Sequence, residues 1–117
     1  MQQLHKKGLA YVHIMSGLTF GFHKKCDAIT MAMARKVYPG PLICNVGYDR
    51  DTADAEIASG NADAVSFGRP YIANPDLVYR WAHDLPLAEA DYTTWFSHDA
   101  KGYADYPTYL EAQAVDE

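Results

Sequence analysis

The chain has 117 residues, of which 49% are hydrophobic and 21% are charged, and this predicts a single globular domain over residues 1–117. Its formal net charge of −5 argues against a nucleic-acid partner, because binding to a phosphate backbone requires a basic surface. No apolar run is long enough to span a bilayer, and residues 1–7 lack the apolar core of a signal peptide, so we expect a cytoplasmic location and no membrane partner.

The two cysteines, Cys26 and Cys44, form neither a CxxC motif nor a spacing typical of a metal site. Isolated cysteines of this kind usually behave as small buried hydrophobic residues. We therefore expect two reduced thiols and no metal ion.

The first predicted strand covers residues 9–15 and follows the end of a short helix. Side chains alternate between the two faces of a strand, so Tyr11, His13 and Met15 are expected on one face. A lone histidine in a strand is more often a packed or hydrogen-bonded residue than a catalyst, which is the interpretation given to His13. Residues 16–23 contain two glycines and predict a loop at the carboxyl end of this strand.

A helix is predicted from Lys24, and residues 38–41, with the sequence YPGP, end it. Apolar residues recur in it at spacings of three and four, which is the pattern of a helix with one buried face. The predicted apolar stripe consists of Cys26, Ile29, Met33 and Val37. We expect this stripe to pack against the sheet.

The second strand is predicted at residues 41–44, and a helix through about Ser59 follows it. Either Asp49 or Asp51 can cap the start of this helix, and Gly60 is placed for a left-handed residue at its end. Its predicted inward face consists of Ala53, Ile57 and Ala58.

The third strand is predicted at residues 64–67 and is followed by Gly68, Arg69 and Pro70. Glycine lets a ligand approach the backbone, and the planar guanidinium of Arg69 suits phosphate oxygens. Pro70 fits the first turn of a short helix, whose amides would face the same anion. The alternative is an ordinary strand-to-helix turn with a surface arginine.

A second glycine-containing turn, at Gly47 and Tyr48, follows the second strand. In barrels of eight parallel strands, the loops after the last two strands are a frequent phosphate site. Two such turns at consecutive strand ends therefore favour phosphate binding. The order of elements, three strands that alternate with helices, predicts a parallel α/β fold.

The remaining chain begins with Asn74, Pro75 and Asp76, which are interpreted as capping residues at the start of another helix. Residues from Asp84 onward are rich in aromatic side chains and predict a long ordered loop, then a short helix from about Thr108. Two aromatic residues of this loop, Trp95 and Phe96, could cover a planar ligand, although packing beneath a loop is the commoner role.

Three blocks of sequence, in this order and spacing, resemble the carboxyl-terminal part of the old yellow enzyme family of flavin-dependent ene reductases. They are GLAYVHI at 8–14, GYDRDTADAEIASGNADAVSFGRPYIANPDL at 47–77 and TTWFSHDAKGYADYPTYLEA at 93–112. The resemblance implies that the three strands are strands six to eight of a TIM barrel, which is incomplete here. It also implies FMN as cofactor, NAD(P)H as reductant and an activated alkene as substrate.

Carried over to this sequence, the resemblance implies that Gly47, Tyr48, Gly68 and Arg69 hold the FMN phosphate. It places Trp95 and Phe96 at the substrate. The chain departs from the family pattern in two places. Val46 stands where members often have glycine, and Phe96 stands where many have tyrosine, so its hydroxyl is missing.

The first five barrel strands, which carry the flavin-ring contacts and the catalytic groups in this family, have no counterpart in the chain. No catalytic residue is therefore assigned. Two exposed sheet edges would remain, which predicts an amino-terminal barrel half in trans, or self-association. The leading hypothesis is the FMN-phosphate-binding part of an ene reductase. The alternative is an inactive remnant or a non-enzymatic module with residual phosphate or FMN binding.

Overall fold

A computed structural model describes residues 1–15, 29–96 and 98–115. The chain forms two compact units, Met1–Ser66 and Phe67–Glu117, here called the sheet unit and the helical unit. Each unit is described by itself. The single domain expected over residues 1–117 stays a prediction.

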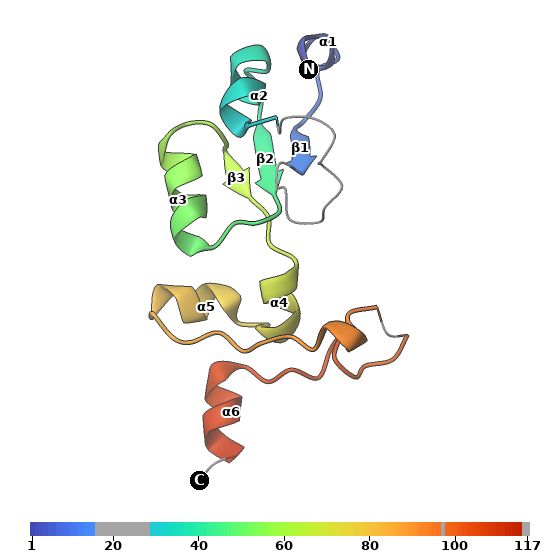
Figure 1. The fold of residues 1–117 in the computed structure, drawn as a ribbon, viewed down its shortest axis with the longest axis vertical. Coiled ribbons are helices and arrows are strands. Elements are labelled where there is room, and N and C mark those ends of the chain that lie inside the picture. The colour runs from blue at the N-terminus through green and yellow to red at the C-terminus, as the bar shows by residue number, and fades with distance from the viewer. Residues whose placement is uncertain (16–28, 97, 116–117) are drawn as a thin grey trace. The chain divides into compact units, whose positions relative to one another are not determined.

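The sheet unit contains the three expected parallel strands, joined by helices (Figure 1). Its elements are α1 (Gln2–His5), β1 (Val12–Met15), α2 (Met31–Val37), β2 (Leu42–Asn45), α3 (Arg50–Ala58) and β3 (Ala64–Val65). The strand order is β1-β2-β3, with Val12 opposite Leu42 and Ile43 opposite Ala64. The predicted α/β class with a parallel sheet is therefore confirmed.

One face of the sheet carries the core of this unit. Its buried residues come from α2, β2 and the segments that flank them, and are Met31, Ala34, Tyr38, Leu42, Cys44 and Ala62. Val12, Ile14 and Val65 pack against this cluster from the same face. His13 and Met15 are exposed, as alternation along β1 predicts.

The predicted buried stripe of α2 is wrong. Thr30 caps the helix, with its hydroxyl accepting from the Met33 amide at 3.2 Å, so α2 begins at Met31. Ile29 and Met33 are 64% and 54% exposed, whereas Met31 and Ala34 are buried. Cys26 and the other residues from 16 to 28 lie outside the described residues, so the predicted loop and the second thiol remain predictions.

The predicted α3 is confirmed at both ends but only partly on its inward face. The Asp49 carboxylate accepts from the Thr52 amide at 2.9 Å, and Gly60 has a φ of +76°. Ala53 is buried, but Ile57 is 43% exposed and Ala58 is also exposed.

The helical unit has short helices joined by the expected long segment. They are α4 (Arg69–Ala73), α5 (Leu77–Ala82), the 3₁₀ helix η1 (Tyr92–Thr94) and α6 (Tyr109–Val115). Ala73 and Leu77 are fully buried, and the ring of Phe67 meets that of Trp81 edge to face with centroids 4.7 Å apart.

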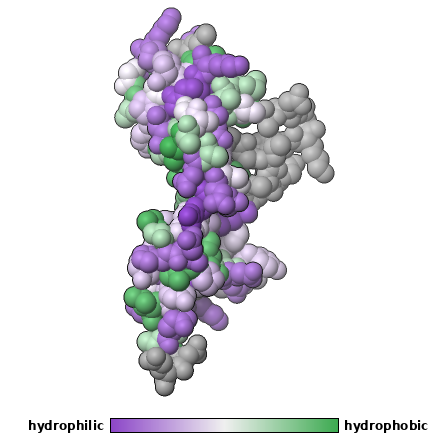
Figure 2. Space-filling view, turned by 90° about the vertical axis from the view of Figure 1, so that its left-hand side faces the viewer, coloured by the Kyte–Doolittle hydropathy of each residue, from purple (hydrophilic) through white to green (hydrophobic). Residues whose placement is uncertain are grey.

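The surface drawn in Figure 2 shows hydrophobic residues interspersed with hydrophilic ones. Large apolar side chains are exposed in both units, among them Met15 in β1 and Val115 in α6. Among the residues that the structure describes, no helix is long and apolar enough to cross a membrane.

Candidate functional site

The turn after β2 contains the first pair of predicted site residues. Val46 and Gly47 both have left-handed backbones, with φ of +78° and +84°. Glycine adopts this conformation without cost, but a β-branched valine does so only under strain. Gly47 is exposed, and Tyr48 is half-buried against the core of the sheet unit. The predicted glycine turn at the carboxyl end of β2 is therefore confirmed, with strain concentrated at Val46.

A carboxylate lies beside this turn, at the start of α3. The Thr52 hydroxyl lies 2.6 Å from the Asp49 carboxylate and the Thr52 amide donates to it, so both contacts lower the pKa of Asp49. Asp49 is thus held as an anion by the first turn of its own helix.

The turn after β3 contains Gly68 and Arg69. Gly68 caps α4, and a side chain added at this glycine would meet no atom within 4 Å. Arg69 is exposed and begins α4, and Pro70 lies in its first turn as predicted. The backbone of this turn is therefore open to a ligand, and a fixed positive charge stands next to it.

The guanidinium of Arg69 stacks on the indole of Trp95, with its central carbon 5.1 Å from the ring centroid. Trp95 follows η1 and is half-buried. Its Nε1 is a buried donor without a hydrogen-bond partner among the described residues. A cation over the face of an indole is attracted by the ring quadrupole, so Trp95 restricts where the Arg69 charge can lie.

Phe96 is 89% exposed, in contrast to its neighbour Trp95. It does not pack beneath the loop, which was the commoner role expected of such a residue. Its ring is available to a planar ligand, and the role of both aromatic residues at a substrate stays a prediction.

A polar cluster joins the carboxyl ends of the three strands. Ser66 Oγ lies 2.9 Å from His13 Nε2, and Asn45 Nδ2 donates to Ser66 Oγ at 2.9 Å and to Ser66 O at 2.7 Å. His13 is therefore a hydrogen-bonded residue, as predicted. The described residues contain no group of three His, Cys, Asp or Glu side chains arranged for a metal ion.

The interpretation of Asn74 as a cap of the following helix is wrong, because Asn74 ends α4 and is fully buried. Asp76 occupies the N-cap position of α5, but its side chain makes no cap bond there. Asp76 instead pairs with Arg80, which is 5% exposed. The four-residue spacing of this pair is visible in the sequence, but nothing in the sequence signals its burial.

The structure thus brings Arg69 and Trp95 together within the helical unit. Gly68 adjoins them in the chain, whereas Gly47 and Tyr48 belong to the sheet unit. Among the described residues, one glycine turn follows β2 in the sheet unit, and one follows β3 at the start of the helical unit. Arg50 begins α3 three residues after Gly47, and Arg69 begins α4 directly after Gly68, so a basic residue follows each of these turns.

The chain matches known flavin enzymes along most of its length. Curated relatives include 12-oxophytodienoate reductase 2 of Arabidopsis thaliana, 34% identical over 97% of this chain and 31% of its own length. Another is 12-oxophytodienoate reductase 1 of Oryza sativa subsp. japonica, 36% identical over 92% of this chain and 29% of its own length.

Solved structures agree with these relatives. The old yellow enzyme from Trypanosoma cruzi is 40% identical with a TM-score of 0.82, over 92% of this chain and 28% of that one. Morphinone reductase in complex with tetrahydroNAD is 37% identical with a TM-score of 0.75, over 92% of this chain and 28% of that one. The chain therefore spans less than a third of the length of these proteins.

A family model also matches residues 2–88, and its description is the NADH:flavin oxidoreductase / NADH oxidase family. This match covers most of the sheet unit and both helices, α4 and α5, that follow it. The resemblance predicted from three blocks of sequence is confirmed, and with it the flavin cofactor of the family. The chain belongs to the NADH:flavin oxidoreductase / NADH oxidase family.

Proposed function

We propose that this chain is the FMN-phosphate-binding, carboxyl-terminal part of an FMN-dependent ene reductase. In this proposal, β1, β2 and β3 are strands six to eight of a TIM barrel. The observation that carries it is the position of Arg69. This residue begins the helix after β3, and its guanidinium stacks on Trp95. The loops after the last strands of such barrels are frequent phosphate sites, which supports the same assignment.

The residues present suit the phosphate end of FMN. Arg69 supplies a permanent positive charge and a planar set of donors, which match phosphate oxygens. The open space at Gly68 leaves room for the phosphate to approach the backbone. For the sheet unit, we propose that Gly47 and Tyr48 contribute backbone amides to phosphate binding. When bound, the flavin would carry hydride from NAD(P)H to an activated alkene.

Trp95 and Phe96 are proposed to contact the substrate. The exposed ring of Phe96 offers an apolar surface to a planar alkene, and it has no hydroxyl to donate to that substrate. Trp95 would then contact the substrate side of the site while it restrains Arg69. No residue of this chain is assigned a proton-transfer role.

FMN binding to the Arg69→Ala variant tests the proposal. Losing a charge-assisted phosphate contact should weaken FMN binding by about 1.5–3 kcal/mol. Isothermal titration with FMN measures this loss. Riboflavin, which lacks the phosphate, should bind the variant and the unchanged chain equally.

Lys36→Ala is the matched control, because it removes one exposed positive charge from α2 in the sheet unit. It should leave the affinity for FMN unchanged. Equal losses for FMN and riboflavin in Arg69→Ala would show that Arg69 does not contact the phosphate. The phosphate assignment would then be wrong.

The activity of the whole relatives is proposed only for an assembly in which the rest of a barrel completes the sheet. The reason for this restriction is that the chain matches only 31% of the length of one relative. An amino-terminal barrel half in trans would meet the unpaired edges of β1 and β3. Mixing the chain with residues of a homologue that cover the first five strands, with FMN and NADPH, should produce alkene reduction.

The second candidate is an inactive remnant or a non-enzymatic module that retains phosphate or FMN affinity. It predicts FMN binding that depends on Arg69 but no alkene reduction in any mixture. Self-association of the chain is measured in the same samples by sedimentation. A cytoplasmic location stays a prediction.

A further inference from the structure

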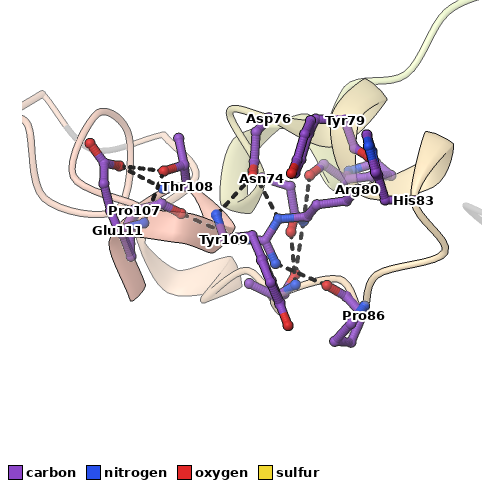
Figure 3. A network of polar contacts seen from close by, with 12 residues as sticks. Asn74, Asp76, Tyr79, Arg80, His83, Pro86, Pro107, Thr108, Tyr109 and Glu111 are labelled. Atoms are coloured by element: carbon purple, nitrogen blue, oxygen red, sulfur yellow. Dashed lines mark hydrogen bonds and ion pairs between the residues drawn. The ribbon is translucent and has the colours of Figure 1, made fainter. Parts of the chain in front are cut away.

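The segment between α5 and α6, residues 83–108, is held at both ends by three side chains of the helical unit. We call these residues, Asn74, Asp76 and Arg80, the loop clamp (Figure 3). Every bond that they make to this segment or to the start of α6 goes to a backbone atom. These hydrogen bonds hold the backbone at both ends of the segment, and the Arg80 guanidinium also lies over the Tyr109 ring, 5.5 Å from its centroid.

Asn74 holds the first end. Its Oδ1 accepts from the Ala88 amide at 2.8 Å, and its Nδ2 donates to the Ala88 carbonyl at 3.0 Å and to the Pro70 carbonyl at 2.8 Å. Asn74 is 0% exposed, so all of its hydrogen-bonding capacity is spent inside the protein. Leaving a buried amide without its hydrogen-bond partners costs free energy, so this position of the Ala88 backbone beside Asn74 is favoured over others.

Arg80 and Asp76 hold both ends. Arg80 Nη1 donates to the Pro86 carbonyl at 2.9 Å and Nη2 to the Pro107 carbonyl at 3.5 Å. Arg80 Nε donates to one oxygen of Asp76 at 2.8 Å, and the other oxygen accepts from the Tyr109 amide at 2.8 Å. One buried ion pair thus connects the two points at which the segment leaves and rejoins the helices.

Two contacts close the segment between these points. The Asp91 amide donates to the Tyr106 hydroxyl at 2.8 Å. Gly102 has a φ of +71°, and a side chain on it would lie 1.9 Å from Thr94 Oγ1, so the two arms of the loop meet there. Trp95 follows Thr94 directly, within this closed part of the loop.

We propose that the loop clamp consists of positioning residues for the phosphate site: it holds Trp95 against Arg69 and thereby fixes the direction of the guanidinium. This inference rests on the proposed function, because it gives the Arg69 site a means of pre-organisation. The clamp acts through the backbone atoms of Pro86, Ala88, Pro107 and Tyr109.

The exposure of Trp95 measures the effect of the clamp without any ligand. In a Trp81→Phe background, Trp95 is the remaining tryptophan of the chain. Arg80→Lys removes the planar fork that reaches Pro86 and Pro107 together, although a lysine can still pair with Asp76. Iodide quenching of Trp95 should rise toward the value of the urea-unfolded chain, and tryptic cleavage after Lys101 should be about tenfold faster.

Arg35→Lys is the matched control in the sheet unit. Arg35 also bonds to two carbonyls and one carboxylate, those of Gly40, Gly60 and Asp63. This substitution should leave the quenching of Trp95 unchanged. Equal effects of Arg35→Lys and Arg80→Lys on Trp95 would overturn the inference.

Asp76→Asn is the second variant, because it keeps the shape of the side chain and an acceptor for the Tyr109 amide. It should increase quenching less than Arg80→Lys does, with a folded circular dichroism spectrum. Unchanged quenching and cleavage in both folded variants would overturn the clamp. If Arg69→Ala leaves FMN affinity unchanged while Arg80→Lys exposes Trp95, the phosphate assignment fails and the clamp stands.

Discussion

The two units of this chain are stabilised in different ways. The sheet unit buries apolar side chains of α2 and β2, such as Met31, Leu42 and Tyr38, against one face of the sheet. The helical unit buries fewer large apolar residues and instead encloses Asn74 and Arg80. Non-directional packing holds the first unit, and directed hydrogen bonds hold the second.

This difference bears on how each unit can position the candidate site residues. Directed bonds to the backbone can hold an irregular segment in one conformation, which packing alone does less specifically. The segment that carries Trp95 and Phe96 is of this irregular kind. The helical unit is therefore suited to place single side chains, and the sheet unit to present the ends of strands.

The largest expected effect is that of breaking the buried ion pair. Asp76→Ala leaves the Arg80 guanidinium buried without its carboxylate, and we expect a loss of about 3–5 kcal/mol from the helical unit. Hydrogen exchange of the α5 amides measures this loss. Asp54→Ala, at an exposed position of α3, is the control and should change little. A loss below about 1 kcal/mol would show that the pair behaves as a surface salt bridge.

A smaller loss is expected when the apolar core of the sheet unit is opened. Leu42 is 0% exposed, and Leu42→Ala should cost about 3 kcal/mol through lost burial and a cavity. The protection of the β2 amides should fall accordingly. Leu110→Ala, at a 63% exposed position of α6, should have no comparable effect. Equal protection in both variants would contradict the described core.

Acid should weaken the helical unit more than the sheet unit. Burial favours the neutral form of Asp76, but the Tyr109 amide and the Arg80 guanidinium outweigh it and lower the pKa of this carboxyl. In the unfolded chain the pKa of this carboxyl is about 3.9, so the stabilisation from its folded-state contacts is fully present above that pH. It is lost as the pH falls through the lower folded pKa.

The comparison in acid is with Asp63, whose pKa is lowered by the Leu42 amide and by Arg35. The Asp63 side chain is 57% exposed and that of Asp76 is 13% exposed, so solvent screens Asp63 more. Hydrogen exchange at pH values above and below about 3.9, the pKa of the unfolded carboxyl, should show the larger loss in α5 on the acid side. Asp76→Asn should remove that difference, and an unchanged difference would refute the assignment.

The smallest expected effect is at the strained turn of the sheet unit. Val46→Gly should relieve the left-handed strain. The entropy lost on fixing a glycine costs less than this relief, so we expect a net gain in stability of about 0.5–1 kcal/mol. Thermal unfolding measures it. The reverse change, Gly47→Ala, should lose about 1 kcal/mol at a φ of +84°. A destabilised Val46→Gly would show that valine side-chain contacts outweigh the strain.

Local patterns in the sequence predicted the strands, their parallel order and the start of α3 at Asp49, because each depends on neighbouring residues. The buried face of α2 was mispredicted. The helix was predicted from Lys24, whereas α2 begins at Met31, so Ile29 lies before the helix. The face that packs on the sheet carries Met31 and Ala34 rather than Met33.

The helical unit was predicted less well, for a different physical reason. Asn74 and Arg80 are polar, and their burial depends on carbonyl groups that lie up to 27 positions further along the chain. The periodicity of apolar residues in the sequence gives no information about hydrogen bonds to such distant carbonyl groups. The positions of Gly68, Arg69 and Pro70 at the start of α4 were predicted, because glycine and proline have strong local preferences.

The burial of Cys44 has a consequence for following the sheet unit in time. Burial raises the pKa of the Cys44 thiol, and its side chain is fully enclosed by the core. An alkylating reagent reacts with thiolate and must reach the sulfur. The rate at which Cys44 is alkylated is therefore limited by the rate at which the core of the sheet unit opens. Measuring this alkylation rate would report how often the sheet unit opens.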